Sequence, residues 1–157
     1  MIRDGKVEDA NKIAKIKIDN WRKTYENIFP DEDLKKLDLE GEIKKYKDCF
    51  NKRKIKTFEK NGNVIAYCYY GNREDDNLHD YTGEIFALYV KNECQEKGIG
   101  TALLNDVIKE LSKEHNKIML WCAKKNHRAI SFYNKNGINI IGEDVENIGG
   151  KNVEKVA

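Results

Sequence analysis

The chain of 157 residues lacks several features that would place it in a specialised class of protein. It has a single proline, Pro30, and no internal repeat, low-complexity segment or linker, so we expect one domain over residues 1–157. No apolar run approaches the roughly 20 residues that a membrane helix needs. The first five residues do not resemble a signal peptide. These absences favour a cytoplasmic protein without a membrane partner.

The charges, cysteines and histidines exclude further classes. Charged residues make up 36% of the chain, but the formal net charge is only +2, so we expect no nucleic-acid partner. The four cysteines include no C-x-x-C pair and predict neither a disulfide framework nor a zinc site. None of the three histidines stands at ligand spacing from another histidine, a cysteine or a carboxylate. We therefore expect no metal.

Apolar periodicity and turn residues predict alternating helices and strands. The dipeptide Asn61-Gly62 is typical of a hairpin turn, and Gly41 favours a break in the second helical region. The acidic stretch at 71–82 is expected to be a solvated loop. The expected order is a strand at 2–3, helices at 7–25 and 30–51, strands at 55–59, 64–70 and 83–90, a helix from 98, a strand at 118–122, a helix at 126–136, and closing strands at 138–142 and 153–156.

The segment 95–101, Gln-Glu-Lys-Gly-Ile-Gly-Thr, predicts phosphate binding because it lies between an apolar strand and an amphipathic helix that begins at Gly98. Glycines at alternate positions let the backbone approach a ligand, and the first N–H groups of a helix have no intrahelical partner. These donors suit a pyrophosphate. Leu103 stands where a dinucleotide fingerprint needs its third glycine, and no Gly-Lys-Ser/Thr completes a P-loop. The remaining pattern is Gln-x-x-Gly-x-Gly.

That pattern resembles motif A of the GNAT superfamily of N-acetyltransferases, Gln/Arg-x-x-Gly-x-Gly/Ala. Residues 126–138 resemble motif B of the same family, N-x-x-A-x-x-F-Y-x-x-x-G-F, with Ile138 in place of the last phenylalanine. The opening, from Asp9-Ala10 to Pro30, resembles a branch of small bacterial GNAT proteins. The resemblance covers most of the chain. It implies an α/β (α+β) GNAT fold with a mixed central sheet of about six or seven strands flanked by helices.

The resemblance also implies an acetyl-CoA-dependent N-acetyltransferase that acts on a primary amine of a small molecule or peptide. We expect direct attack in a ternary complex, since an acyl-enzyme would need a thiol with an adjacent base and none is evident near Cys122. Main-chain groups would bind the pantetheine arm and the pyrophosphate, and the N–H group of Val90 would polarise the thioester carbonyl. The expected cofactor-binding residues are Leu88, Tyr89, Val90, Gln95, Glu96, Lys97, Gly98, Ile99, Gly100, Thr101, Asn126 and Tyr133.

The chemistry requires a base and an acid. An amine with a pKa near 10 is protonated at neutral pH and must lose a proton before it can attack. Glu84, inside the strand at 83–90, is the candidate base, although it could simply reach water at the strand end; Asp80 or a water chain could serve instead. Tyr133 matches the motif B tyrosine and is the expected general acid, unless its ring only packs in the core. Asn126 would contact the pantetheine arm or cap the helix.

The acceptor is less well defined by the sequence. Trp21 and Tyr25 are one helical turn apart and could wall an acceptor pocket with Trp121, although spaced aromatic residues also form cores. Two other functions stay open: a non-catalytic module that binds acyl-CoA for regulation, and a protein N-terminal acetyltransferase. A homodimer is also left open.

Overall fold

The computed structural model describes residues 1–24, 38–74, 80–148 and 151–156, and its largest sheet has five strands. Short 3-10 turns at Val7–Asp9 and Asn92–Cys94 accompany the main elements. These elements are β1 (Ile2–Asp4), α1 (Ala10–Thr24), α3 (Leu39–Cys49), β2 (Lys54–Lys60), β3 (Asn63–Asn72), β4 (Gly83–Val90), α4 (Ile99–Leu111), β5 (Ile118–Leu120), β6 (Cys122–Ala123), α5 (His127–Lys135), β7 (Glu143–Ile148) and β8 (Lys151–Val156).

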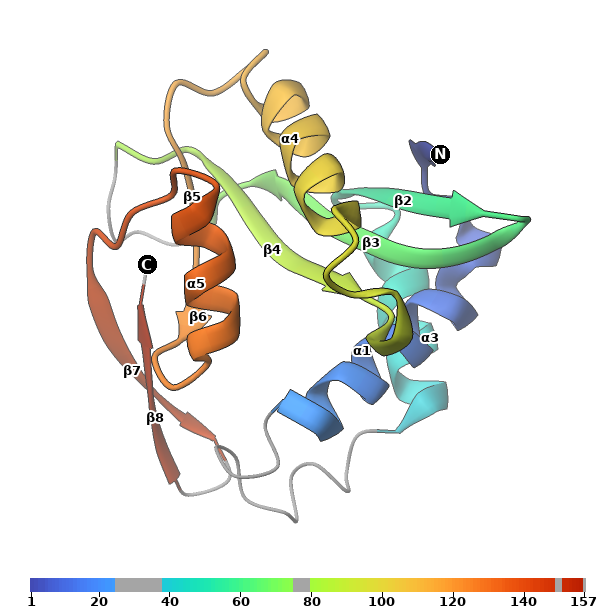
Figure 1. Cartoon of the computed structure of the whole chain (residues 1–157), viewed down its shortest axis with the longest axis horizontal. Helices are drawn as coiled ribbons and strands as arrows, with labels where there is room; N and C mark the ends of the chain where they lie inside the picture. Colours follow the sequence, from blue (N-terminus) through green and yellow to red (C-terminus); the bar gives the residue numbers. More distant parts are fainter. Residues whose placement is uncertain (25–37, 75–79, 149–150, 157) are drawn as a thin grey trace.

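The strands form two hydrogen-bonded groups. The larger sheet has the order β1-β2-β3-β4-β5, with antiparallel neighbours except for the parallel pair β4 and β5. The smaller sheet has the order β6-β8-β7 and is antiparallel. The expected mixed sheet with flanking helices is thus confirmed, and α4 crosses one face of it while α1 and α3 lie on the other (Figure 1).

Each face of the larger sheet carries its own hydrophobic core, because strand side chains alternate between faces. On the α4 face, Leu103 and Val107 pack with Cys68 and Ile85. On the opposite face, α1 and α3 pack against Tyr67, whose hydroxyl lies 2.6 Å from that of Tyr46. The helices therefore clamp β3 and β4 from both sides and hold β4 in place.

The hairpin between β2 and β3 has the predicted turn. Asn61 and Gly62 have φ angles of 52° and 77°, the left-handed conformation that a two-residue hairpin loop requires.

Several sequence predictions need correction. Gly41 does not break the second helix, because α3 begins only at Leu39 and Asp38 caps it by accepting bonds from the amides of Glu40 and Gly41. The closing strand expected at 138–142 is wrong: these residues are neither helix nor strand, and β7 begins at Glu143.

The physical reason for the missing strand is the way α5 ends. Gly137, with a φ of 81°, reverses the chain so that the N–H group of Ile138 donates to the carbonyl of Tyr133 at 3.0 Å. Ile138 then packs against the core beside α5, while Ile140 is 52% exposed. The apolar run at 138–141 therefore follows the turn that ends α5 and does not join a sheet.

The feature that positions the site is the separation of β4 from its neighbour. The pairing of β4 with β5 covers only residues 83–85 of β4 and ends at Ile85 opposite Leu120. Trp121 interrupts the strand predicted at 118–122, and β6 then pairs with β8 instead. The second half of β4 therefore diverges from β6 (Figure 1).

Candidate functional site

A cavity of about 1120 Å³ lies where β4 and β5 separate. Its walls come from α1, the second half of β4, the loop before α4, and α5. Twelve of the residues predicted from the sequence line it: Trp21, Leu88, Tyr89, Val90, Gln95, Glu96, Gly98, Gly100, Thr101, Trp121, Asn126 and Tyr133. Three described residues from the prediction, Glu84, Lys97 and Ile99, are not in its lining. Tyr25 lies outside the described residues.

The main chain of β4 forms one wall. Lys91, just after β4, donates its N–H group to the carbonyl of Ile65 in β3 at 2.8 Å, and this bond sets the hydrogen-bonding alternation of the antiparallel pair. It directs the main-chain groups of Tyr89 toward β3, and those of Leu88 and Val90 toward the side where β5 no longer pairs. Peptide groups of two alternate residues therefore face the cavity.

The loop 95–101 and the start of α4 form a second wall. Gly98 is the N-cap of α4 with a φ of 81°, and as a glycine it brings no side chain to bond the helix amides. The first intrahelical bond runs from the N–H group of Ala102 to the carbonyl of Gly98 at 3.0 Å. The amides of residues 99–101 precede that ladder, so the N-terminus of a 13-residue helix presents donors at the cavity.

The side chain of Gln95 bonds to the protein itself. Its Nε2 donates to the Val90 carbonyl at 3.0 Å and to Oδ1 of Asn20 at 3.1 Å. Asn20, which is buried in α1, donates to the same carbonyl at 3.0 Å and to the carbonyl of Ile16. Gln95 thus fixes the loop to β4 and α1, and Asn20 is a positioning residue that the sequence analysis missed.

Gly100 is small for a reason that the sequence alone does not reveal. A Cβ atom at this position would lie 3.2 Å from Cζ of Phe132 on α5 and 3.6 Å from Cγ2 of Val90. The glycine therefore lets α5 pack against the start of α4. A larger residue would have to displace Phe132 as well as approach any ligand, whereas a Cβ atom on Gly98 would meet no atom within 4 Å.

Helix α5 contributes the polar groups of the opposite wall. Asn126 caps the helix, since its Oδ1 accepts from the N–H group of Ala129 at 3.2 Å. Tyr133 packs edge-on against Phe132, with ring centroids 5.2 Å apart, and both rings border the cavity. Capping by Asn126 is thus observed, and Tyr133 lies where the sequence analysis expects a cleft residue.

Aromatic residues of α1 and β4 line another part of the cavity. The indole Nε1 of Trp21 donates to the hydroxyl of Tyr89 at 2.6 Å, and this bond fixes α1 against β4. Phe86 is passed over in the pairing of β3 with β4, which matches Tyr69 with Ala87 and Tyr70 with Ile85. This bulge turns Phe86 into the lining of the cavity.

Glu84 lies one strand position before the cavity. It is only 9% exposed, and its Oε1 lies 3.5 Å from Nε of Arg73, whose side chain is 1% exposed. An arginine partner stabilises the charged form of a carboxylate, and pairing is what makes a buried charge affordable. The structural role of this pair is to neutralise the buried carboxylate of Glu84.

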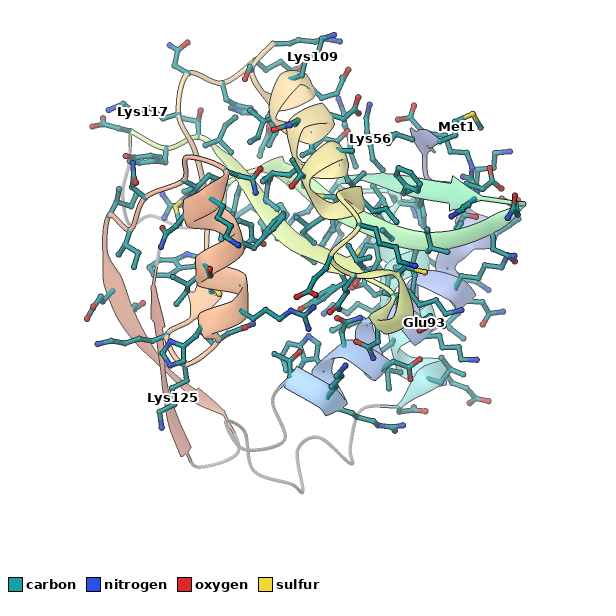
Figure 2. All side chains as sticks on the ribbon, in the orientation of Figure 1. Met1, Lys56, Glu93, Lys109, Lys117 and Lys125 are labelled. Atoms are coloured by element: carbon teal, nitrogen blue, oxygen red, sulfur yellow. The ribbon has the colours of Figure 1, made fainter. Side chains whose placement is uncertain are left out.

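Basic side chains that the sequence analysis did not single out form part of the cavity wall. Lys23, Lys125, His127, Arg128 and Lys135 all line the cavity. Lys125 projects outward from the loop between β6 and α5 (Figure 2). Nη2 of Arg128 lies 3.4 Å from Oε1 of Glu96, so an exposed ion pair links α5 to the loop before α4. The excess of cations favours an anionic ligand.

The described part of the chain holds neither a metal-binding cluster nor a membrane-spanning helix. Within residues 1–24, 38–74, 80–148 and 151–156, no group of three or more histidine, cysteine or carboxylate side chains is arranged to hold a metal ion. No helix in the described part of the chain has both the length and the apolar character needed to cross a membrane.

Comparison with known proteins identifies the family. Residues 15–138 match the Acetyltransferase (GNAT) family. The uncharacterized N-acetyltransferase YuaI of Bacillus subtilis (strain 168) is 29% identical over 160 residues, covering 99% of this chain and 89% of that protein. A probable N-acetyltransferase of Mycobacterium tuberculosis is 31% identical over 148 residues, covering 90% of this chain and 80% of that protein.

A solved structure shares the fold. That structure is yncA from Salmonella typhimurium, determined with its cofactor acetyl-CoA; it has a TM-score of 0.74 and 20% identity, and the match covers 99% of this chain and 90% of that chain. The split sheet, the glycine-capped α4 and the two sequence motifs agree with the family match. The chain belongs to the GNAT family of acetyltransferases and is an acetyl-CoA-dependent N-acetyltransferase.

Proposed function

We propose that the protein transfers the acetyl group of acetyl-CoA to a primary amine of a small molecule or peptide by direct attack in a ternary complex. One observation carries this proposal. The open edge of β4, the N-terminus of α4 and the ring of Tyr133 all border the same cavity. An extended thioester with a pyrophosphate at one end needs those three features in that arrangement.

The cavity fits the donor substrate in its polar groups. The main-chain groups of Leu88 and Val90 would pair with the pantetheine amides as an added strand does. The amides of residues 99–101 would bind the pyrophosphate, with Gly98 leaving the approach open. Arg128, which pairs with Glu96 in the loop before α4, would neutralise phosphate charge there. The cofactor of the similar structure, yncA, supports this fit.

Acetyl transfer requires a bond from the amine nitrogen to the thioester carbon, loss of the carbon–sulfur bond, and a proton for the departing sulfur. In our proposal the N–H group of Val90 donates to the carbonyl oxygen as charge develops there. Tyr133 gives its hydroxyl proton to the sulfur. The aromatic wall that includes Trp21, Phe86 and Trp121 holds the acceptor on the other side of the thioester.

Direct attack is favoured over an acyl-enzyme by the state of Cys122. This cysteine lines the cavity, but burial raises the pKa of its thiol to about 11. The thiolate is the nucleophilic form, so a thiol with this pKa is almost entirely unreactive at neutral pH.

The base that accepts the ammonium proton is proposed to be Glu84. Its carboxylate is not in the lining of the cavity, so a water molecule would carry the proton from the acceptor past Phe86. The ion pair with Arg73 gives Glu84 an alternative role, which is to neutralise a buried arginine rather than to accept a proton. The two roles make different predictions about pH.

We predict that Gly98→Ala weakens acetyl-CoA binding, because an alanine strains the left-handed N-cap and places a methyl group at the phosphate approach. Gly62→Ala is the matched control: its φ is 77°, its Cβ atom would also meet nothing within 4 Å, and it lies in the remote hairpin. Both variants should lose about 1–2 kcal/mol of stability in urea unfolding. In calorimetry only Gly98→Ala should bind acetyl-CoA about tenfold or more weakly. Equal affinities in the two variants would contradict the phosphate site.

For Tyr133→Phe, we predict that kcat falls by about 100-fold or more, since only the acidic hydroxyl is removed. The affinity for acetyl-CoA should stay unchanged. Thiol release from acetyl-CoA would be measured across amines, amino acids and peptides, which also tests the proposed function. Tyr69→Phe removes a hydroxyl from a half-buried tyrosine that does not line the cavity, and should retain wild-type kcat. A Tyr133→Phe enzyme with wild-type kcat would show that water protonates the sulfur.

A third prediction concerns pH. If Glu84 is the base, Glu84→Gln should lower kcat/KM at neutral pH, and the deficit should shrink as the pH rises toward about 10, where amines lose their proton unaided. The control is Glu59→Gln, because Glu59 also pairs with an arginine, Arg3, from a strand far from the cavity. Both variants should unfold at lower temperature. A loss of activity in Glu84→Gln that is the same at every pH would assign Glu84 to structure alone.

A further inference from the structure

A second cavity of about 300 Å³ lies beneath α5. One face of the helix lines it, and the other side is formed by β5 and by the irregular segment that follows Gly137. No residue of α5 is fully buried, and the chain leaves the helix as a loop rather than as a strand. Most of the cavity's described lining is apolar.

This smaller cavity adjoins the proposed reaction centre. The two cavities share three lining residues, Leu120, Cys122 and Tyr133. Leu120 is also the residue at which the pairing of β4 with β5 ends, so it stands at the closed end of the gap between the strands. In the proposed function Tyr133 faces the thioester sulfur. An acyl group attached to that sulfur therefore lies against the wall between the two cavities.

The chemistry of the lining differs sharply between the cavities. Five basic side chains and Glu96 line the large cavity. None of the described residues that line the small one carries a charge, and seven of them are isoleucine, leucine or methionine: Ile118, Met119, Leu120, Ile130, Ile138, Ile140 and Ile141. Such a surface disfavours phosphate or amine groups and favours a hydrocarbon chain.

We propose that the small cavity is an acyl-chain pocket and that the enzyme uses acyl-CoA donors longer than acetyl-CoA, with butyryl-CoA as the donor to test. The proposal rests on the proposed function, since it places the thioester beside Tyr133. The bonds that change are the same as with acetyl: nitrogen–carbon forms, carbon–sulfur breaks, and the sulfur takes a proton. The added methylene groups take no part in the chemistry and contribute only burial.

Calorimetry with the full-length protein tests this pocket. Each buried methylene should strengthen binding about fourfold, so butyryl-CoA should bind wild-type protein about 16-fold more tightly than acetyl-CoA. Ile130 lines the small cavity and not the large one, so Ile130→Phe should fill the pocket. That variant should lose about tenfold or more in affinity for butyryl-CoA and keep its affinity for acetyl-CoA within about twofold.

The matched control is Ile108→Phe, the same exchange at a half-buried position on α4. It should leave the ratio of butyryl-CoA to acetyl-CoA affinity unchanged, and thermal unfolding of both variants would verify folding. Should Ile130→Phe fail to fold, Asn134→Leu, on the same face of α5, should raise the affinity for butyryl-CoA alone. Acetyl-CoA binding with no gain from the longer chain would overturn the acyl-chain pocket. Failure of every acyl-CoA to bind would instead overturn the proposed function.

Discussion

The structure depends on one constraint, which is that β4 loses its neighbour after Ile85 although its later residues stay partly buried. Main-chain N–H and C=O groups that are shielded from water need hydrogen-bond partners. The carbonyl of Val90 has two, the side-chain amides of Asn20 and Gln95. The rest of the edge faces the large cavity, where the amides of a pantetheine arm would complete the pattern of a sheet. In the proposed function, cofactor recognition is therefore an extension of the sheet.

The same carbonyl ties the parts of the site together. Asn20 connects it to α1, and Gln95 connects it to the loop that leads into α4. Gly100 allows Phe132, and with it α5, to close on the start of α4. The position of Tyr133 therefore follows from packing at Gly100. Substitutions at the two glycines therefore have different effects. A change at Gly98 alters the backbone conformation of the N-cap, whereas a change at Gly100 alters the packing of α5 against α4.

Sequence patterns predicted the regular parts of this fold well. The strand at 83–90, the hairpin at Asn61-Gly62 and the helix capped by Asn126 have strong local signals and appear as expected. The run at 138–142 has the apolar character of a strand. It does not form one, because the chain turns at Gly137 and Ile138 packs against the core beside α5, and this packing is a tertiary effect. The break at Trp121 has the same origin, since pairing with β8 over a long sequence separation determines it.

The site shows a similar division. A glycine-rich loop before a helix carries its function in local backbone geometry, so residues 95–101 could be singled out from their order alone. Arg128 could not be singled out from the sequence, because its contact with Glu96 joins two segments that no periodic pattern relates. The partner of Glu84 could not be predicted from the sequence either, because Arg73 directly follows β3 and meets Glu84 only through the pairing of β3 with β4. Long-range electrostatic partners of this kind require coordinates.

The central claim is that main-chain groups of β4 and α4 bind the donor substrate, and an amide NMR titration of labelled protein with CoA tests it directly. The account predicts that the largest shifts occur at the amides of Val90 and residues 99–101. The amides of Asn61 and Gly62 in the remote hairpin should not move. Saturable binding that leaves Val90 and the start of α4 unchanged, or no binding of CoA at all, would contradict it.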